Sequence, residues 1–198
     1  MDVPAKRRTR LKKVRRTPLG RDAWLAAART ALIEEGIGGV EVGKLARKLS
    51  ATRGGFYWFF DSRKELLECL LADWEENNTA AFKSVVRARG ANDTAEFQAL
   101  CDVWITEDGY SPQWDAAMRE WARISERAEK VVRRVDDARI EIIQQIFHDM
   151  GYKDPEAFVR ARIAYFHQVG YYTLGVRESR ERRMQLLPLY IRYLTGRE

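Results

Sequence analysis

From residue 21 onward, apolar residues recur at spacings of three and four, the period of an amphipathic helix. Ser, Asp or Ser-Pro stands where these stretches begin, and glycine stands where several of them end. No segment alternates apolar and polar residues between turns as a strand would. The pattern predicts an all-α fold, and proline should divide its last helix at Pro188. Helices are expected over residues 21–35, 42–49, 52–59, 62–90, 93–104, 111–124, 126–150, 154–176 and 179–194.

Composition narrows the class of protein further. The 198 residues are 45% apolar, which suits one domain or two small ones and excludes a disordered protein. The chain holds no run of about 18 uncharged apolar residues, and no apolar stretch follows its basic start, so we expect a cytoplasmic protein that contacts no membrane. Cys69 and Cys101 lack a C-x-x-C pattern or a histidine at metal-ligand spacing. We expect two buried free thiols, no metal and no cofactor.

The positive charge is concentrated at the N-terminus. Residues 1–16 hold eight Lys and Arg against one Asp, a net charge of +7, although the whole chain carries only +6. This segment has little to bury, so we expect a disordered basic arm that contacts DNA phosphates. A solubilising tail is the alternative. The residues expected to touch DNA are Arg7, Arg8, Arg10, Lys12 and Lys13.

Two short helices joined by a tight turn, at residues 42–59, have the spacing of a helix-turn-helix. Ala46 is small where the two helices must cross, and Thr52 can cap the second helix. Gly54 and Gly55 each cost about 1 kcal/mol relative to alanine inside a helix. Close approach of the backbone to a DNA duplex would explain them.

Residues 21–67 resemble the N-terminal domain of TetR-family transcriptional regulators. The resemblance lies in Gly36-Ile-Gly-Gly-Val40, in Val42-x-x-Leu45-Ala46, and in Thr52-Arg-Gly-Gly-Phe-Tyr-Trp-Phe-Phe-Asp-Ser-Arg-Lys-Glu-Leu-Leu67. It implies a homodimer that reads a near-palindromic operator, with a larger C-terminal domain that binds an effector. The expected division is a basic arm at 1–16, a three-helix DNA-binding domain at 17–66, and an antiparallel helical effector and dimerisation domain at 67–198.

The resemblance also assigns residues to DNA. Tyr57 falls where the family usually touches phosphate, although core packing with a wet hydroxyl is the alternative. Arg63 falls where the family has a phosphate-binding lysine, while Phe60 is expected in the core. Solvated charges are the alternative for Lys44 and Arg53. The expected DNA-binding residues of the domain are Lys44, Thr52, Arg53, Gly54, Gly55, Tyr57, Trp58 and Arg63.

The sequence departs from the family at two further places. Ser50 and Ala51 stand where the family usually has Gly-Val, so a positive φ at Ser50 would be costly. Glu41 replaces the usual Ser or Thr cap of the preceding helix. We nevertheless interpret the domain as functional.

Aromatic residues between positions 70 and 176 suggest a pocket for a small apolar or aromatic effector. Ordinary core packing is the alternative for each of them. The expected ligand-binding residues are Trp74, Trp104, Trp114, Met118, Trp121, Phe147, Tyr165, His167 and Tyr171.

The helix at 154–176 is apolar on two faces, so it needs two partners. One is the body of the same chain, and the other is most simply a second copy. A helix buried within a monomer is the alternative. The expected dimer residues are Phe158, Phe166, Val169, Tyr172, Leu186, Tyr190 and Tyr193.

Enzymatic function finds no support in the motifs. The chain has no G-x-x-x-x-G-K-[ST], G-x-G-x-x-G, H-E-x-x-H or G-x-S-x-G. Asp136 and Asp137 neighbour Arg133, Arg134 and Arg139, so we expect ion pairs rather than acid–base catalysis. The sequence favours a ligand-responsive repressor, and a helical adaptor without specific DNA binding is the alternative.

Overall fold

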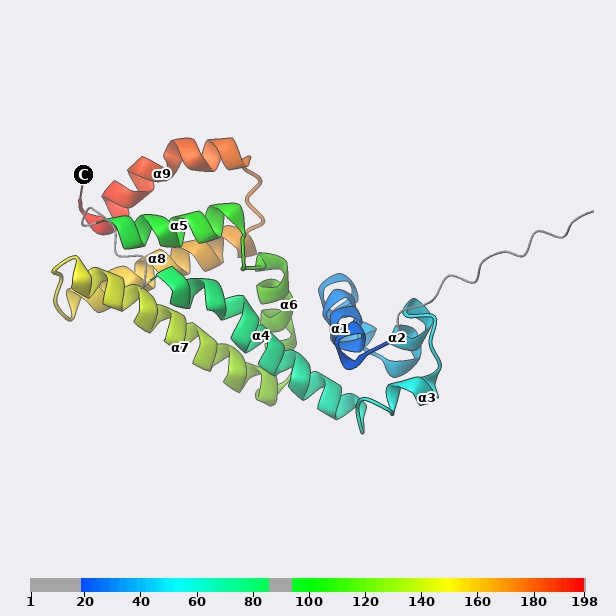
Figure 1. The fold of residues 1–198 in the computed structure, drawn as a ribbon. Helices are drawn as coiled ribbons and strands as arrows, with labels where there is room; N and C mark the ends of the chain where they lie inside the picture. Colours follow the sequence, from blue (N-terminus) through cyan, green and yellow to red (C-terminus); the bar gives the residue numbers. More distant parts are fainter. Residues whose placement is uncertain (1–18, 86–93, 198) are drawn as a thin grey trace, which may run out of the picture.

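The computed structural model describes residues 19–85 and 94–197, and this part of the chain is helical without a strand (Figure 1). The all-α prediction is therefore confirmed. The basic arm, with Arg7, Arg8, Arg10, Lys12 and Lys13, lies outside the described residues. The helices are α1 (Arg21–Glu35), the short 3-10 helix η1 (Ile37–Gly39), α2 (Val42–Lys48), α3 (Arg53–Phe56), α4 (Arg63–Val85), α5 (Ala95–Thr106), α6 (Pro112–Ala122), α7 (Glu126–Asp149), α8 (Glu156–Thr173) and α9 (Arg180–Thr195).

Local capping explains why most helix starts follow the sequence. The hydroxyls of Ser111, Ser125 and Ser179 accept a backbone N–H at the starts of α6, α7 and α9. At the start of α4, Ser62 accepts from the N–H of Glu65, whose carboxylate accepts from the N–H of Asp61 at 2.6 Å. These side chains satisfy backbone donors that the helix itself leaves free.

The helices form two lobes, one built by α1–α3 and the other by α5–α9, with α4 running between them (Figure 1). The first core crosses from one lobe to the other, because Trp24 and Phe56 belong to the same buried cluster as Trp114 and Trp121 of α6. A second core lies among α4, α5, α7, α8 and α9. The expected domain boundary after residue 66 falls inside α4.

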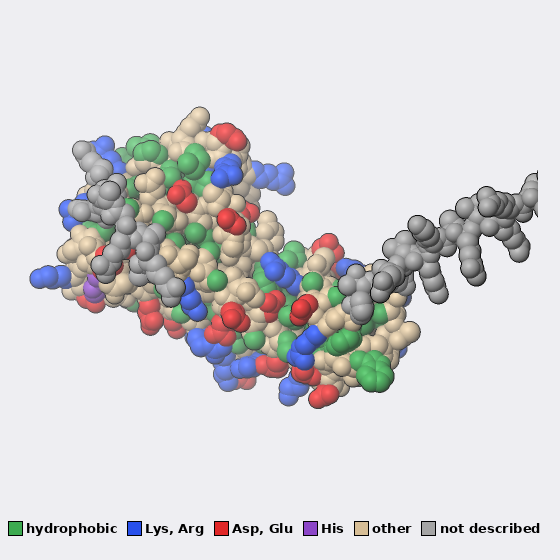
Figure 2. All heavy atoms as spheres, viewed as in Figure 1, with side chains coloured by type: hydrophobic (Ala, Val, Ile, Leu, Met, Phe, Trp, Pro, Cys, Tyr) green, Lys and Arg blue, Asp and Glu red, His purple; other side chains and the backbone are tan. Residues whose placement is uncertain are grey.

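Ion pairs fasten α4 to α7 along the outside of the molecule. Glu68 pairs with Arg127 at 2.7 Å, and seven residues further along both helices Glu75 pairs with Arg134 at 2.6 Å. Acidic and basic side chains accordingly lie together over these helices (Figure 2). The hydrogen bonds from the two guanidinium groups lower the pKa of each carboxyl.

Two predicted helix boundaries are wrong. Helix α9 continues through Pro188 and bends instead of ending there (Figure 1). Proline removes one backbone hydrogen bond, but Leu187 is buried and Ile191 and Leu194 pack against the second core, which holds both halves in place. Helix α8 is expected to begin at residue 154 but begins at Glu156. The Asp154–Pro155 peptide bond before it is cis, and the Asp154 carboxylate accepts a hydrogen bond from the Gln144 amide.

A third boundary also differs. The helix expected to reach residue 59 ends at Phe56, because residues 57–59 form turns.

In the part of the chain that the structure describes, each helix is too short or too polar to span a bilayer.

Candidate functional site

The turn between α2 and α3 holds a strained residue. Ser50 has φ +52, the left-handed conformation that glycine adopts more easily. The backbone N–H of Ala51 reaches back to the carbonyl of Ala46 at 2.8 Å and closes the turn. The expected conformational cost at Ser50 is therefore present. Glu41 gives α2 no side-chain cap.

Helix α3 separates buried from exposed aromatic rings. Phe56 stacks on Phe60 with ring centroids 5.3 Å apart, and Trp24 meets Phe56 edge-on at the same distance. Phe60 is 1% exposed, which confirms its expected place in the core. Tyr57 and Trp58 face solvent, with exposed fractions of 59% and 86%. Large apolar rings so open to water are unusual unless they meet a partner.

The remainder of α3 is open as well. Thr52, Arg53 and Gly54 are exposed, and the Thr52 hydroxyl accepts the N–H of Gly55 at 3.0 Å, as a cap should. A Cβ placed on Gly54 or Gly55 would meet only the Thr52 hydroxyl, at 3.8 and 3.5 Å. Nothing in the described part of the chain therefore demands glycine at these two positions, which fits close approach by an external partner.

Arg53 lies against α2. A Cβ at Gly43 would come within 2.7 Å of the Arg53 Nη2, so the absence of a side chain at Gly43 gives the guanidinium its place. Arg53 remains exposed, as Tyr57 and Trp58 are.

Lys44 and Arg63, both expected to contact DNA, donate hydrogen bonds to the backbone of their own domain, although Arg63 is exposed and Lys44 is only partly buried. The Lys44 ammonium donates to the carbonyl of Gly38 at 3.0 Å and lies 3.6 Å from Glu41. Arg63 donates to the carbonyls of Val40 and Ile37 at 2.6 and 3.0 Å. Both cations therefore hold the η1 segment and the residue after it in place, and DNA contact by these accessible side chains stays a prediction.

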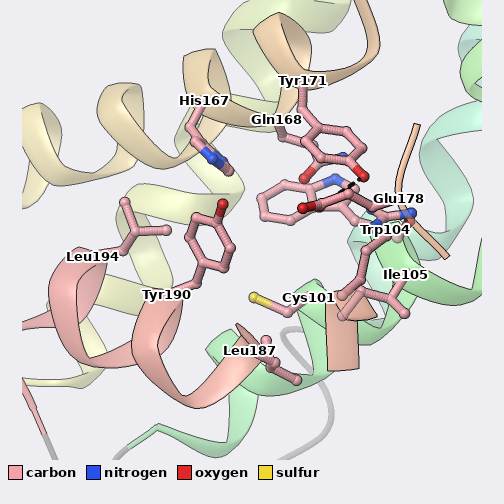
Figure 3. Close-up of a pocket in the computed structure, with 11 residues that line it drawn as sticks. Cys101, Trp104, Ile105, His167, Gln168, Tyr171, Glu178, Leu187, Tyr190 and Leu194 are labelled. Carbon is pink, nitrogen blue, oxygen red and sulfur yellow. Dashed lines mark hydrogen bonds between the residues drawn. The ribbon is translucent and has the colours of Figure 1, made fainter. Parts of the chain in front are cut away.

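A pocket lies between α5, α8 and α9 (Figure 3). Three of the expected ligand-binding residues, Trp104, His167 and Tyr171, line it. Residues that the sequence analysis did not assign to it complete the wall, namely Cys101, Ile105, Gln168, Glu178, Arg183, Leu187, Tyr190 and Leu194. Burial raises the pKa of the Cys101 thiol to about 12 and lowers that of His167, so both are neutral near pH 7.

The other expected ligand-binding residues do not line this pocket. Phe147 packs against Phe97 in the second core, and Tyr165 is buried with its hydroxyl on Asp136. Four more belong to the core that joins the lobes, which are Trp74, Trp114, Met118 and Trp121. The pattern of aromatic residues predicted the helices, but it did not predict which side of each helix faces the pocket.

A buried charged network lies between the pocket and the α1–α3 lobe. The Asp115 carboxylate accepts hydrogen bonds from Arg139 at 2.8 Å, from Asn78 at 2.7 Å and from the Trp74 indole at 3.0 Å. Burial alone would lower the pKa of Arg139, but Asp115 raises it above its ordinary value. These contacts tie α4, α6 and α7 together.

A second ion pair beside this network corrects the expected partners. Asp136 binds Arg119 of α6 through two hydrogen bonds, of 2.8 and 2.6 Å, instead of its sequence neighbours. Arg133 and Arg134 pair with Glu129 and Glu75. The Arg119–Asp136 and Arg134–Glu75 pairs each join two helices, so their geometry matches that of structural ion pairs.

The expected dimer residues divide into two groups. Phe158, Phe166, Tyr190 and Tyr193 of α8 and α9 are exposed. Tyr172 and Val169 pack against the second core, and the Tyr172 hydroxyl donates to the Trp104 carbonyl at 2.7 Å. Leu186 is partly buried.

Comparison with known proteins bears on the α1–α4 region. Residues 25–70 match the family model described as bacterial regulatory proteins, tetR family. This match identifies residues 25–70 as a domain of the tetR type. TetR-family proteins are DNA-binding transcription regulators, and the helix-turn-helix of α2 and α3 lies within the matched residues. A comparison with curated protein sequences finds no match.

Solved structures of transcriptional regulators share the fold over most of the chain. GusR of Salmonella enterica has a TM-score of 0.67 at 17% identity, over 89% of this chain and 93% of that one. The ketosteroid transcriptional regulator KstR2 of Mycobacterium tuberculosis has 0.66 at 16%, over 86% and 92%. The fatty acid degradation regulator FadR from Bacillus halodurans has 0.66 at 12%, over 89% and 94%. Identities this low establish the fold alone.

Proposed function

We propose that this TetR-family chain is a homodimeric repressor that binds a near-palindromic operator and is released by a small apolar or aromatic effector. The observation that carries the proposal is the exposed face of α3 and the following turn, where Thr52, Arg53, Gly54, Tyr57 and Trp58 face solvent. A short helix with two open glycines and exposed rings is shaped to enter a major groove.

Each residue on this face has a distinct role in the proposal. Arg53 offers a guanidinium to a base edge or a phosphate, and the Tyr57 hydroxyl donates to a phosphate. Trp58 supplies apolar contact. Gly54 and Gly55 let the backbone approach the duplex, and Thr52 holds the first turn of α3 closed. The basic arm adds contacts that depend on salt but not on sequence.

Exposed apolar residues support the dimer. Phe158, Val159, Ile163 and Phe166 lie along α8, and their exposed fractions range from 40% to 54%. Leu189 and Tyr193 extend the exposed apolar surface onto α9. A second copy that covers these residues would remove apolar area from water and set two copies of α3 at a fixed spacing.

The pocket supports an effector. It is closed on three sides by α5, α8 and α9, and aromatic and aliphatic side chains make up most of its wall (Figure 3). Two of the solved regulators with the same fold are named for ketosteroid and for fatty acid degradation, which agrees with an apolar ligand. The division into a DNA-binding domain at 17–66 and an effector and dimerisation domain at 67–198 is part of the same proposal.

Selection of random DNA fragments by the purified protein at moderate salt tests the DNA function. We expect enrichment of one inverted-repeat sequence. Arg53→Gln should weaken binding to the selected site about 5- to 150-fold, because a specific base contact contributes about 1 to 3 kcal/mol. Arg182→Gln, a matched change of an exposed arginine on α9, should leave binding unchanged.

Two outcomes would contradict this account. Recovery of fragments without a common sequence would favour the helical adaptor. Equal losses with Arg53→Gln and Arg182→Gln would show that the exposed face of α3 does not read DNA.

A further inference from the structure

Arg183 is an arginine buried in the pocket wall, and its nearest partners are neutral. Its side chain is 12% exposed, and Nη2 donates to the Trp104 carbonyl at 2.9 Å and lies 3.5 Å from the Tyr172 hydroxyl. The carboxylate paired with it, that of Glu107, is 3.8 Å from Nη1, near the limit of an ion pair. A buried cation gains most from a close anion, and guanidinium matches carboxylate geometry.

Gln168 supplies a second donor from the opposite wall. The residue is 6% exposed, lines the same pocket from α8, and its Nε2 has no hydrogen-bond acceptor in the described part of the chain (Figure 3). A buried amide N–H without a partner is costly, so this group favours a ligand that brings an acceptor oxygen.

The remaining wall suits an apolar body. Cys101, Ile105, Leu187 and Leu194 are apolar or, in the case of the thiol, uncharged, and the Trp104 ring lies among them. Two carboxylates would oppose an anion, namely Glu107, which is 3.8 Å from Arg183, and Glu178 in the pocket wall. Glu178 lies on the connection between α8 and α9, is only partly buried, and accepts a hydrogen bond from the Tyr171 hydroxyl at 3.2 Å.

We propose that the effector is an amphipathic carboxylate whose head binds Arg183 and Gln168 and whose apolar body lies between Trp104, Leu187 and Leu194. This inference rests on the effector role proposed above and gives that effector a chemical class. The competing ligand class is an organic cation bound by Glu178 and the aromatic rings. Because Arg183 and Glu178 carry opposite charges, neutralising one of them should weaken the binding of only one of the two ligand classes.

The same contacts link the ligand to the rest of the molecule. The pocket has a volume of about 50 Å³ and is partly open to solvent. A ligand that is longer than this space can extend into solvent or displace a wall. Helix α9 is the wall that lacks a backbone hydrogen bond, at Pro188. As α9 moves, the carboxylate replaces the Trp104 carbonyl as the partner of Arg183.

Loss of the Arg183 hydrogen bond would leave the Trp104 carbonyl with the Tyr172 hydroxyl as its donor and would act on the segment between α5 and α6. That segment begins at Glu107 and ends at Ser111, whose backbone N–H donates to the Asn78 side chain of α4 at 2.7 Å. On α6, the Trp114 ring lies 3.7 Å from the Arg29 guanidinium of α1. A shift of this segment thus reaches both helices that hold the DNA-binding lobe, so the carboxylate should weaken operator binding.

Three probes with the same chain and different head groups test the proposal, namely decanoate, decanol and decyltrimethylammonium. Binding is measured by calorimetry and by Trp fluorescence at pH 7. Decanoate should bind the full-length protein most tightly. Arg183→Gln should lower the affinity for decanoate at least tenfold and the affinity for decanol less than twofold. Glu178→Gln should raise the affinity for decanoate. The matched surface variant Arg182→Gln should change the affinity for neither decanoate nor decanol.

The outcomes separate the chemistries even if Arg183→Gln fails to fold, because the wild type and Glu178→Gln suffice. Preference for decyltrimethylammonium, lost in Glu178→Gln, would overturn the carboxylate in favour of a cation. Failure of all three probes to bind would overturn the pocket as the effector site. DNA binding is measured separately without a probe, so a protein that selects an operator but ignores decanoate contradicts only this inference.

Discussion

At the scale of single residues, Asp115 and Arg139 form a buried ion pair between α6 and α7. Arg139 is fully buried and remains charged, so removal of its carboxylate partner leaves a cation without compensation. The same carboxylate also orders Asn78 and the Trp74 indole, which face it from α4. The pair therefore positions α4 against α6 and α7 and so contributes to placing the DNA-binding lobe.

We predict that Asp115→Ala lowers the free energy of unfolding by about 3 to 5 kcal/mol, because it leaves a buried charge unpaired. Urea denaturation followed by circular dichroism measures the change. Asp137→Ala, a change of an exposed carboxylate on α7, should stay within about 0.5 kcal/mol of the wild type. Similar losses for the two variants would show that the buried pair has no special role.

Residue types in the sequence were enough to predict some of these positions and not others. The left-handed strain at Ser50 and the buried place of Phe60 follow from local pattern. Lys44 and Arg63 donate to the backbone carbonyls of Gly38, Ile37 and Val40, and no side-chain pattern marks a carbonyl as an acceptor. The sequence therefore could not predict these contacts within the domain.

At the scale of elements, caps and apolar spacing set helix limits well, since both act within one or two turns. Helix α1 and the start of α7 lie where the sequence places them. The continuation of α9 through Pro188 was missed because it depends on packing against α5, a contact between distant parts of the chain. The pocket was misassigned for the same reason, since the orientation of each helix is set by its neighbours.

The exposed face of α8 carries the prediction at this scale. Phe166→Glu should convert the dimer to monomers, because the dimer would bury an unpaired carboxylate at a cost of several kcal/mol. Sedimentation equilibrium gives the mass. Ile124→Glu is the matched control, since Ile124 is 76% exposed and lies outside α8 and α9. A dimer that survives both Phe166→Glu and Ile163→Glu would place the interface elsewhere.

At the scale of the whole molecule, the two lobes share a core. Trp114 and Trp121 of α6 pack with Trp24 and Phe56 of the DNA-binding lobe, and α4 runs through both lobes. Movement near the pocket therefore has two physical routes to α3, along α4 and across α6.

A dimer must fit two major grooves at a fixed spacing, so small rotations of the lobes are enough to remove DNA contacts. An effector that favours the rotated state by 1 to 3 kcal/mol would lower operator affinity about 5- to 150-fold, and the operator would weaken the effector by the same factor.

We propose that a dimer of this chain reads DNA with two copies of α3, and hydroxyl-radical footprinting on a selected DNA fragment tests this directly. We expect two protected half-sites related by inversion, with centres about 34 to 36 Å apart or a multiple of that distance, and loss of both in Phe166→Glu. A single protected site, or two half-sites in direct repeat, would contradict it.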